Sequence, residues 1–379
     1  MITLKDKKDC AGCGACGAVC PKKCITMERD SLGFVYPAVD EAACVACGAC
    51  ERVCPVLHPE EEQPAPLAVK ALRARDEALR AESSSGGVFT LLAREILREG
   101  GAVYGAAFDG ELRVRHIRAE DEAGLAPLRG SKMIQSAAWE VYPEIRAVLK
   151  EGRKVLFTGT PCQVYGLKKY LGGDPEGLVT ADLICHGVGS EEVFRRYLAD
   201  QAREAGSPVK AVSFRCKQTG WRNYAVRLTL ASGAVKLKPH AEDGFMRVYL
   251  RNYALRPSCY ACRFKGNRRL SDLTLADAWG AERYAKELDD DRGLSAVVCR
   301  TQKGAELLRR AAEGCAGAEI PAEALERWNA SIVRSPLEPQ NNADFVREIL
   351  AAPYRATVSR YCRTSLLKKL KRRIRALIG

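Results

Sequence analysis

The sequence lacks two features that would tie the chain to a membrane or to secretion. It contains no run of about 18 apolar residues, the length that a membrane-spanning helix requires. Its start, MITLKD, has no apolar h-region of the kind that a signal peptide contains. We therefore expect a protein of the cytoplasm without a spanning helix.

The sequence also lacks the usual nucleotide-binding and nucleic-acid-binding motifs. No GxGxxG follows an apolar strand and no Walker sequence occurs, so a nicotinamide Rossmann site is unsupported. No zinc finger, RNA-recognition signature or basic stripe with interleaved aromatic residues is present. Nucleic acid is therefore not an expected partner, although the formal net charge is +13.

Cysteine, in contrast, is abundant, with 17 residues in 379. Two copies of the pattern C-x2-C-x2-C-x3-C-P begin at Cys10 and Cys44. This spacing is typical of ferredoxins that hold two [4Fe–4S] clusters, in which the fourth cysteine of each run ligates the other cluster. The pattern predicts one cluster on Cys10, Cys13, Cys16 and Cys54, and a second on Cys44, Cys47, Cys50 and Cys20.

Zinc and disulfides are the alternatives for these cysteines. Zinc sites favour paired ligands, so the third close cysteine of each run would be surplus. Disulfides do not account for two identical triplets that each end in Cys-Pro. The cysteine content therefore indicates electron transfer in a reducing compartment.

The rest of the chain changes character after a linker. Residues 1–57 form the predicted dicluster unit, and residues 58–68 (HPEEEQPAPLA) are rich in proline and glutamate. Alternating apolar strands and amphipathic helices then predict an α/β domain with a mixed sheet over residues 69–330. We expect strands at 102–108, 154–157, 178–184, 209–215, 224–230, 273–279 and 296–300, and an irregular segment with a basic tail over 331–379.

Four further cysteines fall at positions suited to a site. Cys162 and Cys185 follow predicted strands, where ligands bind in open α/β sheets, and Cys259 and Cys262 form a CxxC pair. These four thiols suit another metal site. Zinc or plain core cysteines explain them equally well from the residues alone.

Three more segments carry polar groups near predicted strands or helix starts. Ser83–Gly87 precedes a helix and offers backbone amides to a phosphate, although a simple serine cap is the commoner role. Residues 130–136 (GSKMIQS) hold Lys132 in a polar loop, where it is either solvated or beside a cofactor. Residues 271–280 (SDLTLADAWG) place two acids on a strand, which need partners if they are buried.

The segments SSSGGVFTLL, GSKMIQS, FTGTPCQ, DLICHG, RPSCYACRF and SDLTLADAWG, in this order, resemble the coenzyme F420 hydrogenase/dehydrogenase beta-subunit family. The resemblance covers roughly residues 1–300, including the fused ferredoxin-like α+β dicluster domain. It implies FAD and a third [4Fe–4S] cluster on Cys162, Cys185, Cys259 and Cys262. It also implies flavin or phosphate contacts from Ser85, Gly86, Gly87 and Lys132.

The resemblance implies an iron–sulfur flavoprotein oxidoreductase whose small-molecule acceptor takes two electrons, such as coenzyme F420. A non-catalytic electron-transfer subunit is the alternative. The basic charge predicts an acidic redox partner protein. Six of the bases lie after Thr364 and leave +7 for the rest of the chain. Residues 365–379 have leucine and isoleucine on one helical face and bases on the other, which suits peripheral contact with an anionic membrane or an acidic partner. A terminal helix packed on its own domain, with solvated charges, explains the pattern equally well.

Overall fold

The computed structural model describes residues 1–363. Its N-terminal unit holds a hairpin of β1 (Ile25–Arg29) and β2 (Val35–Val39) and the short helices α1 (Ala15–Val19) and α2 (Ala49–Arg52). Each helix begins after a glycine in the left-handed region, with φ of 72° at Gly14 and 70° at Gly48. The twofold cysteine repeat is thus also a structural repeat, as expected of a dicluster ferredoxin fold.

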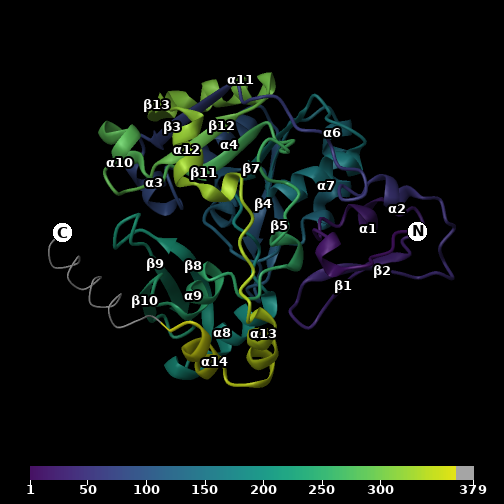
Figure 1. Ribbon diagram of the computed structural model, residues 1–379. Helices are drawn as coiled ribbons and strands as arrows, with labels where there is room; N and C mark the ends of the chain where they lie inside the picture. Colours follow the sequence, from purple (N-terminus) through teal and green to yellow (C-terminus); the bar gives the residue numbers. More distant parts are fainter. Residues whose placement is uncertain (364–379) are drawn as a thin grey trace.

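A mixed sheet of eight strands forms the centre of the larger domain (Figure 1). The four strands β11, β7, β6 and β4 run parallel to one another, and the pairs β4–β5, β11–β12, β12–β3 and β3–β13 are antiparallel. In the order β13-β3-β12-β11-β7-β6-β4-β5, the bounds are Cys315–Glu319, Ala68–Ala74, Ser295–Cys299, Leu273–Asp277, Leu178–Leu183, Val155–Gly159, Ala102–Phe108 and Val114–Ala119. The predicted mixed α/β sheet is confirmed, with three further strands, β3, β5 and β13, that the sequence pattern did not reveal.

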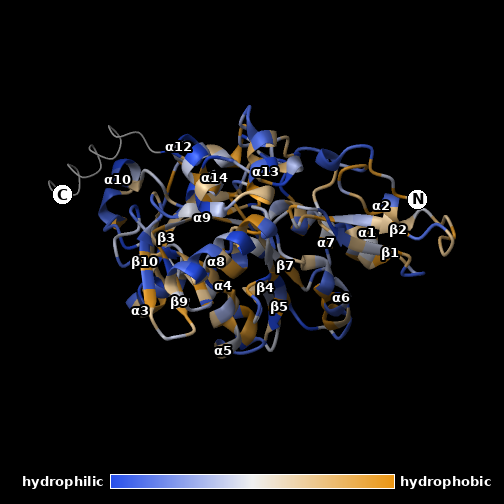
Figure 2. Ribbon diagram, turned by 90° about the horizontal axis from the view of Figure 1, so that it is seen from below, coloured by the Kyte–Doolittle hydropathy of each residue, from blue (hydrophilic) through white to orange (hydrophobic). Residues whose placement is uncertain are grey.

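Helices cover both faces of this sheet because successive strand residues point to opposite sides. Val103 of β4 packs with α4 (Val88–Arg98) and α11 (Gln302–Ala311), whereas Tyr104 packs with α6 (Tyr142–Lys150) and α7 (Pro161–Leu171). Helices such as α6 and α8 carry both hydrophobic and hydrophilic stretches in Figure 2, as expected of helices with one buried side. The domain thus has three layers, and the carboxyl ends of the parallel strands β6 and β7 lie at the same edge of the sheet.

A second, three-stranded antiparallel sheet lies beside the large one, with the order β10-β9-β8. Its strands span Val235–Pro239, Ala225–Leu230 and Val209–Cys216, and the helices α8 (Glu191–Ala205) and α9 (Gly244–Leu250) pack with it. Four short α-helices lie elsewhere in the larger domain: α3 (Glu77–Glu82), α5 (Glu122–Leu125), α10 (Ala281–Tyr284) and α12 (Ala322–Trp328).

The prediction of an irregular segment after residue 330 is wrong for residues 342–361. These residues form α13 (Asn342–Ala351) and α14 (Tyr354–Tyr361), which pack against α8 and α9 beside the small sheet (Figure 1). Phe345 and Ile349 are fully buried at i,i+4 spacing, and Phe345 stacks on Tyr253 at 4.6 Å between ring centroids. This segment therefore completes the core around the small sheet.

The ferredoxin unit packs closely on the large domain. A Cβ at Gly14 would lie 2.4 Å from Trp139, and one at Gly166 of α7 would lie 3.1 Å from the Cys13 sulfur. The Tyr142 hydroxyl donates to the Cys13 carbonyl at 3.1 Å. Glycine on both sides thus brings the first cysteine loop against α7 and the segment before α6.

No helix within residues 1–363 is long and apolar enough to cross a membrane. The basic amphipathic tail expected over residues 365–379 lies outside the described residues.

Candidate iron–sulfur centres and flavin site

One pocket of the ferredoxin unit brings the fourth cysteine of the first run to the second run. Cys20 lines it together with Cys44, Cys47 and Cys50, around about 360 Å³ of space that includes the open mouth. Cys47 is exposed, whereas Cys50 is buried. Cys20 therefore lies beside the second run, at the protein surface, and crossed ligation of the two clusters stays a prediction.

The other cysteine group is more enclosed. Burial, followed by the neighbouring Cys10 and Cys54, raises the pKa of the Cys16 thiol to about 12. Burial also raises the pKa of Cys13. Four thiols in such surroundings are unfavourable as free thiolates, and binding to iron offsets that penalty. The donor set and its setting fit a cubane cluster.

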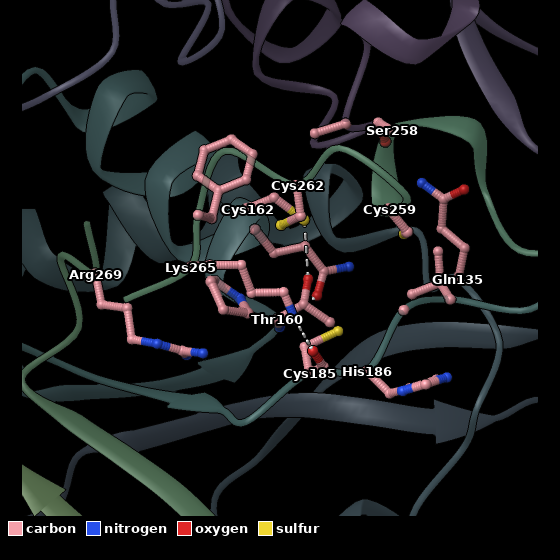
Figure 3. A pocket seen from close by; sticks show the side chains of 16 residues that line it. Gln135, Thr160, Cys162, Cys185, His186, Ser258, Cys259, Cys262, Lys265 and Arg269 are labelled. Atoms are coloured by element: carbon pink, nitrogen blue, oxygen red, sulfur yellow. Dashed lines mark hydrogen bonds between the residues drawn. The ribbon is translucent and has the colours of Figure 1, made fainter. Parts of the chain in front are cut away.

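A third pocket gathers the four dispersed cysteines, Cys162, Cys185, Cys259 and Cys262 (Figure 3). Cys162 is the second residue of α7, and Cys185 follows the end of β7 by two residues. Both therefore lie at the carboxyl edge of the parallel strands. Thr160 and Gln163 cap the start of α7 with a reciprocal pair of hydrogen bonds, which fixes the turn that carries Cys162. The pocket has about 580 Å³ of free space including its mouth.

Positive charge surrounds this third pocket. Lys265 donates to the carbonyls of Cys185 at 2.5 Å and Ser331 at 2.8 Å. The buried Arg269 pairs with Asp182 at 2.9 Å, and its Nε and Nη2 atoms have no hydrogen-bond partner. Unpartnered buried guanidinium donors beside four thiols suit an anionic iron–sulfur group.

Across residues 1–363, no three His, Cys, Asp or Glu side chains converge tightly enough for a single metal ion. In the third pocket the four thiols instead line a shared space.

The loop Ser83–Gly87 lies between the large sheet and α4. Gly87 has φ of 89° and directly precedes α4, and no side chain caps the helix. Ser85 and Gly86 are already engaged: the Ser85 hydroxyl donates to the Leu294 carbonyl at 2.8 Å, and the Gly86 amide donates to the Ser295 hydroxyl at 2.9 Å. The first-turn amides of α4 are therefore the donors that a phosphate would meet.

The Lys132 loop adjoins the Ser83–Gly87 loop. The hydroxyls of Ser131 and Ser84 lie 3.1 Å apart. The Lys132 ammonium, however, donates to the carbonyls of its own loop, Pro127 at 2.9 Å, Arg129 at 2.6 Å and Gly130 at 3.1 Å. Burial lowers the pKa of Lys132 to about 7. The structure thus joins the two loops and uses Lys132 to hold one of them.

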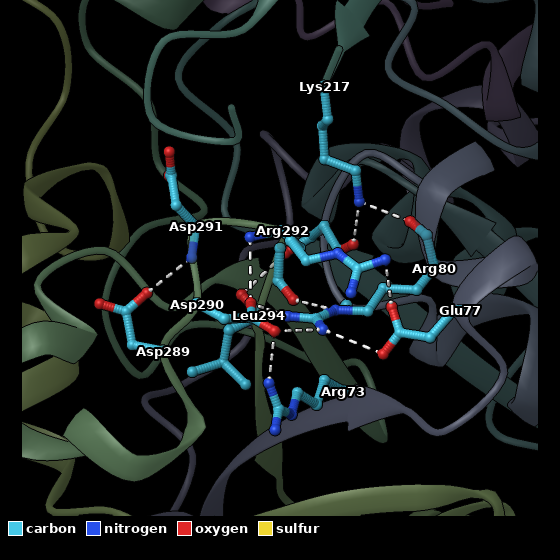
Figure 4. Close-up of polar contacts among 12 residues, drawn as sticks. Arg73, Glu77, Arg80, Lys217, Asp289, Asp290, Asp291, Arg292 and Leu294 are labelled. Atoms are coloured by element: carbon cyan, nitrogen blue, oxygen red, sulfur yellow. Dashed lines mark hydrogen bonds and ion pairs between the residues drawn. The ribbon is translucent and has the colours of Figure 1, made fainter. Parts of the chain in front are cut away.

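A buried ionic cluster that the sequence reasoning missed supports the same loop (Figure 4). Lys217, from just beyond β8, donates to the carbonyls of Ser85 at 2.8 Å and Arg80 at 2.5 Å. Arg80 is 1% exposed and pairs with Asp290. The run of three acids at Asp289–Asp291 was the available signal, because such a run needs cations when it folds inward.

The two acids of the 271–280 segment have structural partners. Asp272 is fully buried and accepts hydrogen bonds from Thr180 and Thr301, each at 2.7 Å. Asp277 accepts from Arg215 at 2.9 Å and from the indole of Trp221 at 3.1 Å. These acids therefore fasten β11 to its neighbours.

Comparisons with known proteins agree with this architecture. Residues 152–322 match the family model for the C terminus of the coenzyme F420 hydrogenase/dehydrogenase beta subunit, and residues 9–57 match the 4Fe-4S dicluster domain. A chain in a structure of the F420-reducing [NiFe] hydrogenase complex from Methanosarcina barkeri has a similar fold. It is 19% identical with a TM-score of 0.50, over 76% of this chain and 94% of that chain. A search of curated proteins found no match.

The dicluster domain identifies residues 9–57 as an iron–sulfur electron-transfer unit. Residues 152–322 thus carry the C-terminal domain of the coenzyme F420 hydrogenase/dehydrogenase beta-subunit family, and the chain joins this domain to an N-terminal ferredoxin domain.

Proposed function

We propose that the protein is an iron–sulfur flavoprotein oxidoreductase that delivers electrons to a two-electron organic acceptor, with coenzyme F420 as the first candidate. When bound, iron–sulfur clusters carry single electrons, and a flavin exchanges one or two. The observation that carries the proposal is the position of the third pocket. Ala11, within the first cysteine run, lines it together with Cys162 and Cys259.

In this proposal each group of residues has a distinct task. The third cluster is held by the four thiols of the pocket, Cys162, Cys185, Cys259 and Cys262. The start of α4 binds a phosphate of FAD through backbone amides, while Ser85 and Gly86 fix the loop on β12. Lys132 holds the adjoining loop closed. Lys217 fastens the Ser85 carbonyl from the small sheet.

The alternative is an electron-transfer subunit that feeds a separate enzyme. One observation favours it: Ser85, Gly86 and Lys132 are all bonded to other parts of the protein. The two proposals differ in flavin content. Protein purified without oxygen should contain about twelve irons, the content of three cubanes, and one flavin, and should reduce F420 when dithionite supplies electrons. If the protein contains all of the about twelve irons but no flavin, and takes up none when flavin is added, it is an electron-transfer subunit and the flavoprotein proposal is wrong.

We place electron entry at the exposed ferredoxin pocket, with an acidic redox protein as the partner. Cys47 and Val45 are exposed there, and Lys22 lines the pocket, whereas the N-terminal amine of Met1 pairs with Glu51 at 3.2 Å. Residues 1–57 as a whole carry seven basic and seven acidic side chains. Local charge at the pocket, rather than the charge of the domain, supports this choice of partner.

We also propose a cytoplasmic protein with peripheral membrane contact through its last residues. All 17 cysteines are free, which suits a reducing compartment. Six bases without an acid follow Thr364. Removing residues 365–379 should abolish sedimentation with anionic liposomes at low salt, and no sedimentation of the intact chain would rule out this contact.

A further inference from the structure

A buried arginine joins the first cysteine run to the third pocket. Arg256 is 1% exposed and lies three residues before Cys259. Its backbone amide donates to the Val188 carbonyl at 3.0 Å, and its own carbonyl accepts from the Cys259 amide at 2.8 Å. The main chain of Arg256 is thus part of the turn that presents Cys259 to the pocket.

The guanidinium of Arg256 reaches into the ferredoxin unit. It donates to the Cys10 carbonyl at 2.8 Å through Nε, to Gln135 Oε1 at 2.8 Å and to the Val35 carbonyl at 3.0 Å. It also lies 4.3 Å from the Tyr36 ring centroid. A Cβ at Gly12 would lie 2.7 Å from the guanidinium carbon, so glycine leaves room for it. Covalent and hydrogen bonds therefore run continuously from Cys10 to Cys259.

No carboxylate within residues 1–363 forms an ion pair with Arg256, in contrast to the buried Arg80 and Arg269. A buried cation without an anion is costly, even when its hydrogen bonds are complete. The anionic groups at hand are cysteine ligands. Gln135, which accepts a hydrogen bond from Arg256 at 2.8 Å, also lines the third pocket beside Cys162 and Cys259.

We propose that Arg256 is a positioning residue and the shared fixed counter-charge of the Cys10 cluster and the third cluster. This inference rests on the proposed function, because it assumes a cluster in the third pocket. A cubane with four thiolate ligands becomes more negative on reduction, so a nearby buried cation stabilises the reduced state. Arg256 thereby raises the reduction potential of both centres and holds their ligand loops at a constant separation.

The test is an anaerobic redox titration of the full-length holoprotein followed by electron paramagnetic resonance, with iron content measured on the same samples. Arg256→Gln removes the charge, and Arg256→Lys keeps it. Arg195→Gln is the control, since Arg195 is exposed on α8 and pairs with Glu192. We expect Arg256→Gln to disfavour reduction of the Cys10 cluster at least tenfold, which is 59 mV for a one-electron couple. The reduction potential should shift far less in Arg256→Lys, and it should not shift in the Arg195→Gln control.

Unchanged potentials in Arg256→Gln with full iron would overturn the proposal. If Arg256→Gln fails to assemble its clusters, Arg256→Lys decides. Full iron with near-native potentials supports the charge role, and loss of iron in that variant as well assigns Arg256 to packing alone. Wild-type protein with about eight irons instead of about twelve would refute the third cluster and the proposed function. The potential of the Cys10 cluster would still test Arg256 separately.

Discussion

The Nε atom of Arg256 lies 2.8 Å from the carbonyl oxygen of Cys10, although 246 positions separate the two residues in the chain. This contact couples the ferredoxin unit to the turn that carries Cys259. It means that the first cysteine run and the third pocket are one structural unit. The predictions below separate the contributions of the individual parts.

Crossed ligation of the two ferredoxin clusters can be tested with single cysteine variants. Cys54→Ser should alter the same resonance signal as Cys13→Ser, because both side chains belong to the enclosed group. Cys20→Ser should instead alter the signal that Cys47→Ser changes, since these two cysteines share a pocket. Pairing of Cys20 with Cys13 in this experiment would contradict the crossed arrangement.

The third pocket makes a prediction about iron content. Cys259→Ser in the full chain should remove about four irons, because one cubane loses a ligand. Cys299→Ser is the matched control, since Cys299 is buried on β12 away from the pocket and its thiol contacts the Thr301 carbonyl. Equal iron in the two variants would show that the pocket holds no cluster.

Lys132 should act mainly by holding its own loop. Lys132→Met leaves three carbonyls without their donor, at a cost of about 1 kcal/mol each in the free energy of unfolding. We expect weaker flavin binding, measured by fluorescence titration, and a lower urea midpoint. Lys150→Met, at an exposed site on α6, is the control. Slower electron transfer with unchanged flavin affinity would instead indicate that Lys132 acts on the flavin directly.

His116 predicts a specific dependence of stability on pH. The imidazole is 3% exposed, its Nε2 donates to the Thr158 carbonyl at 2.9 Å, and Ser136 donates to Nδ1 at 3.0 Å. Burial lowers its pKa from 6.5 to about 4. The unfolded chain therefore binds a proton between pH 6.5 and 4 that the folded state does not bind, so this contribution to stability is lost as the pH falls.

Between pH 7 and pH 5.5 this difference amounts to about 1 kcal/mol in the free energy of unfolding. The measurement is the urea midpoint at both pH values for the native protein and for His116→Gln. The variant should lose less stability than the native protein over this interval. An equal loss in both would mean that His116 titrates normally.

Electron entry at the exposed pocket predicts a salt-dependent encounter with an acidic donor protein. Lys22→Glu should slow reduction severalfold at low ionic strength, and the difference should vanish at high salt because screening removes steering. Lys210→Glu, exposed on β8, is the control for net charge. Equal slowing by both variants would place the encounter elsewhere or make it nonspecific.

The sequence was sufficient for the features that depend on local pattern. Buried apolar runs predicted β4, β6 and β7, and these strands place Cys162 and Cys185 at one edge of the sheet, as parallel topology requires. The repeated cysteine spacing likewise predicted that Cys20 would join the second run. In these cases a short segment contains all the information that decides its structure.

Features built from distant segments were not predictable in this way. The α13 helix was missed because its apolar residues, such as Phe345 and Ile349, occupy one short segment and gain a partner only when Tyr253 is in place. Arg256 likewise shows nothing unusual in the sequence, since its contacts to Cys10 and Val35 exist only after the two domains have packed. Contacts between segments that are distant in the sequence therefore determine both the position of α13 and the contacts of Arg256.

The glycine contacts between the domains have a kinetic consequence. Because a Cβ at Gly14 would lie 2.4 Å from Trp139, the surfaces meet without space for a hydration layer, and little relative rotation is available to them. The rate of electron transfer between the two domains should therefore not depend on solvent viscosity or crowding. The encounter with an external donor remains diffusive. The absorbance change after mixing with the donor, recorded with and without glycerol, should show two phases. Glycerol should slow the phase that reports the encounter with the donor and leave the phase of intramolecular electron transfer unchanged.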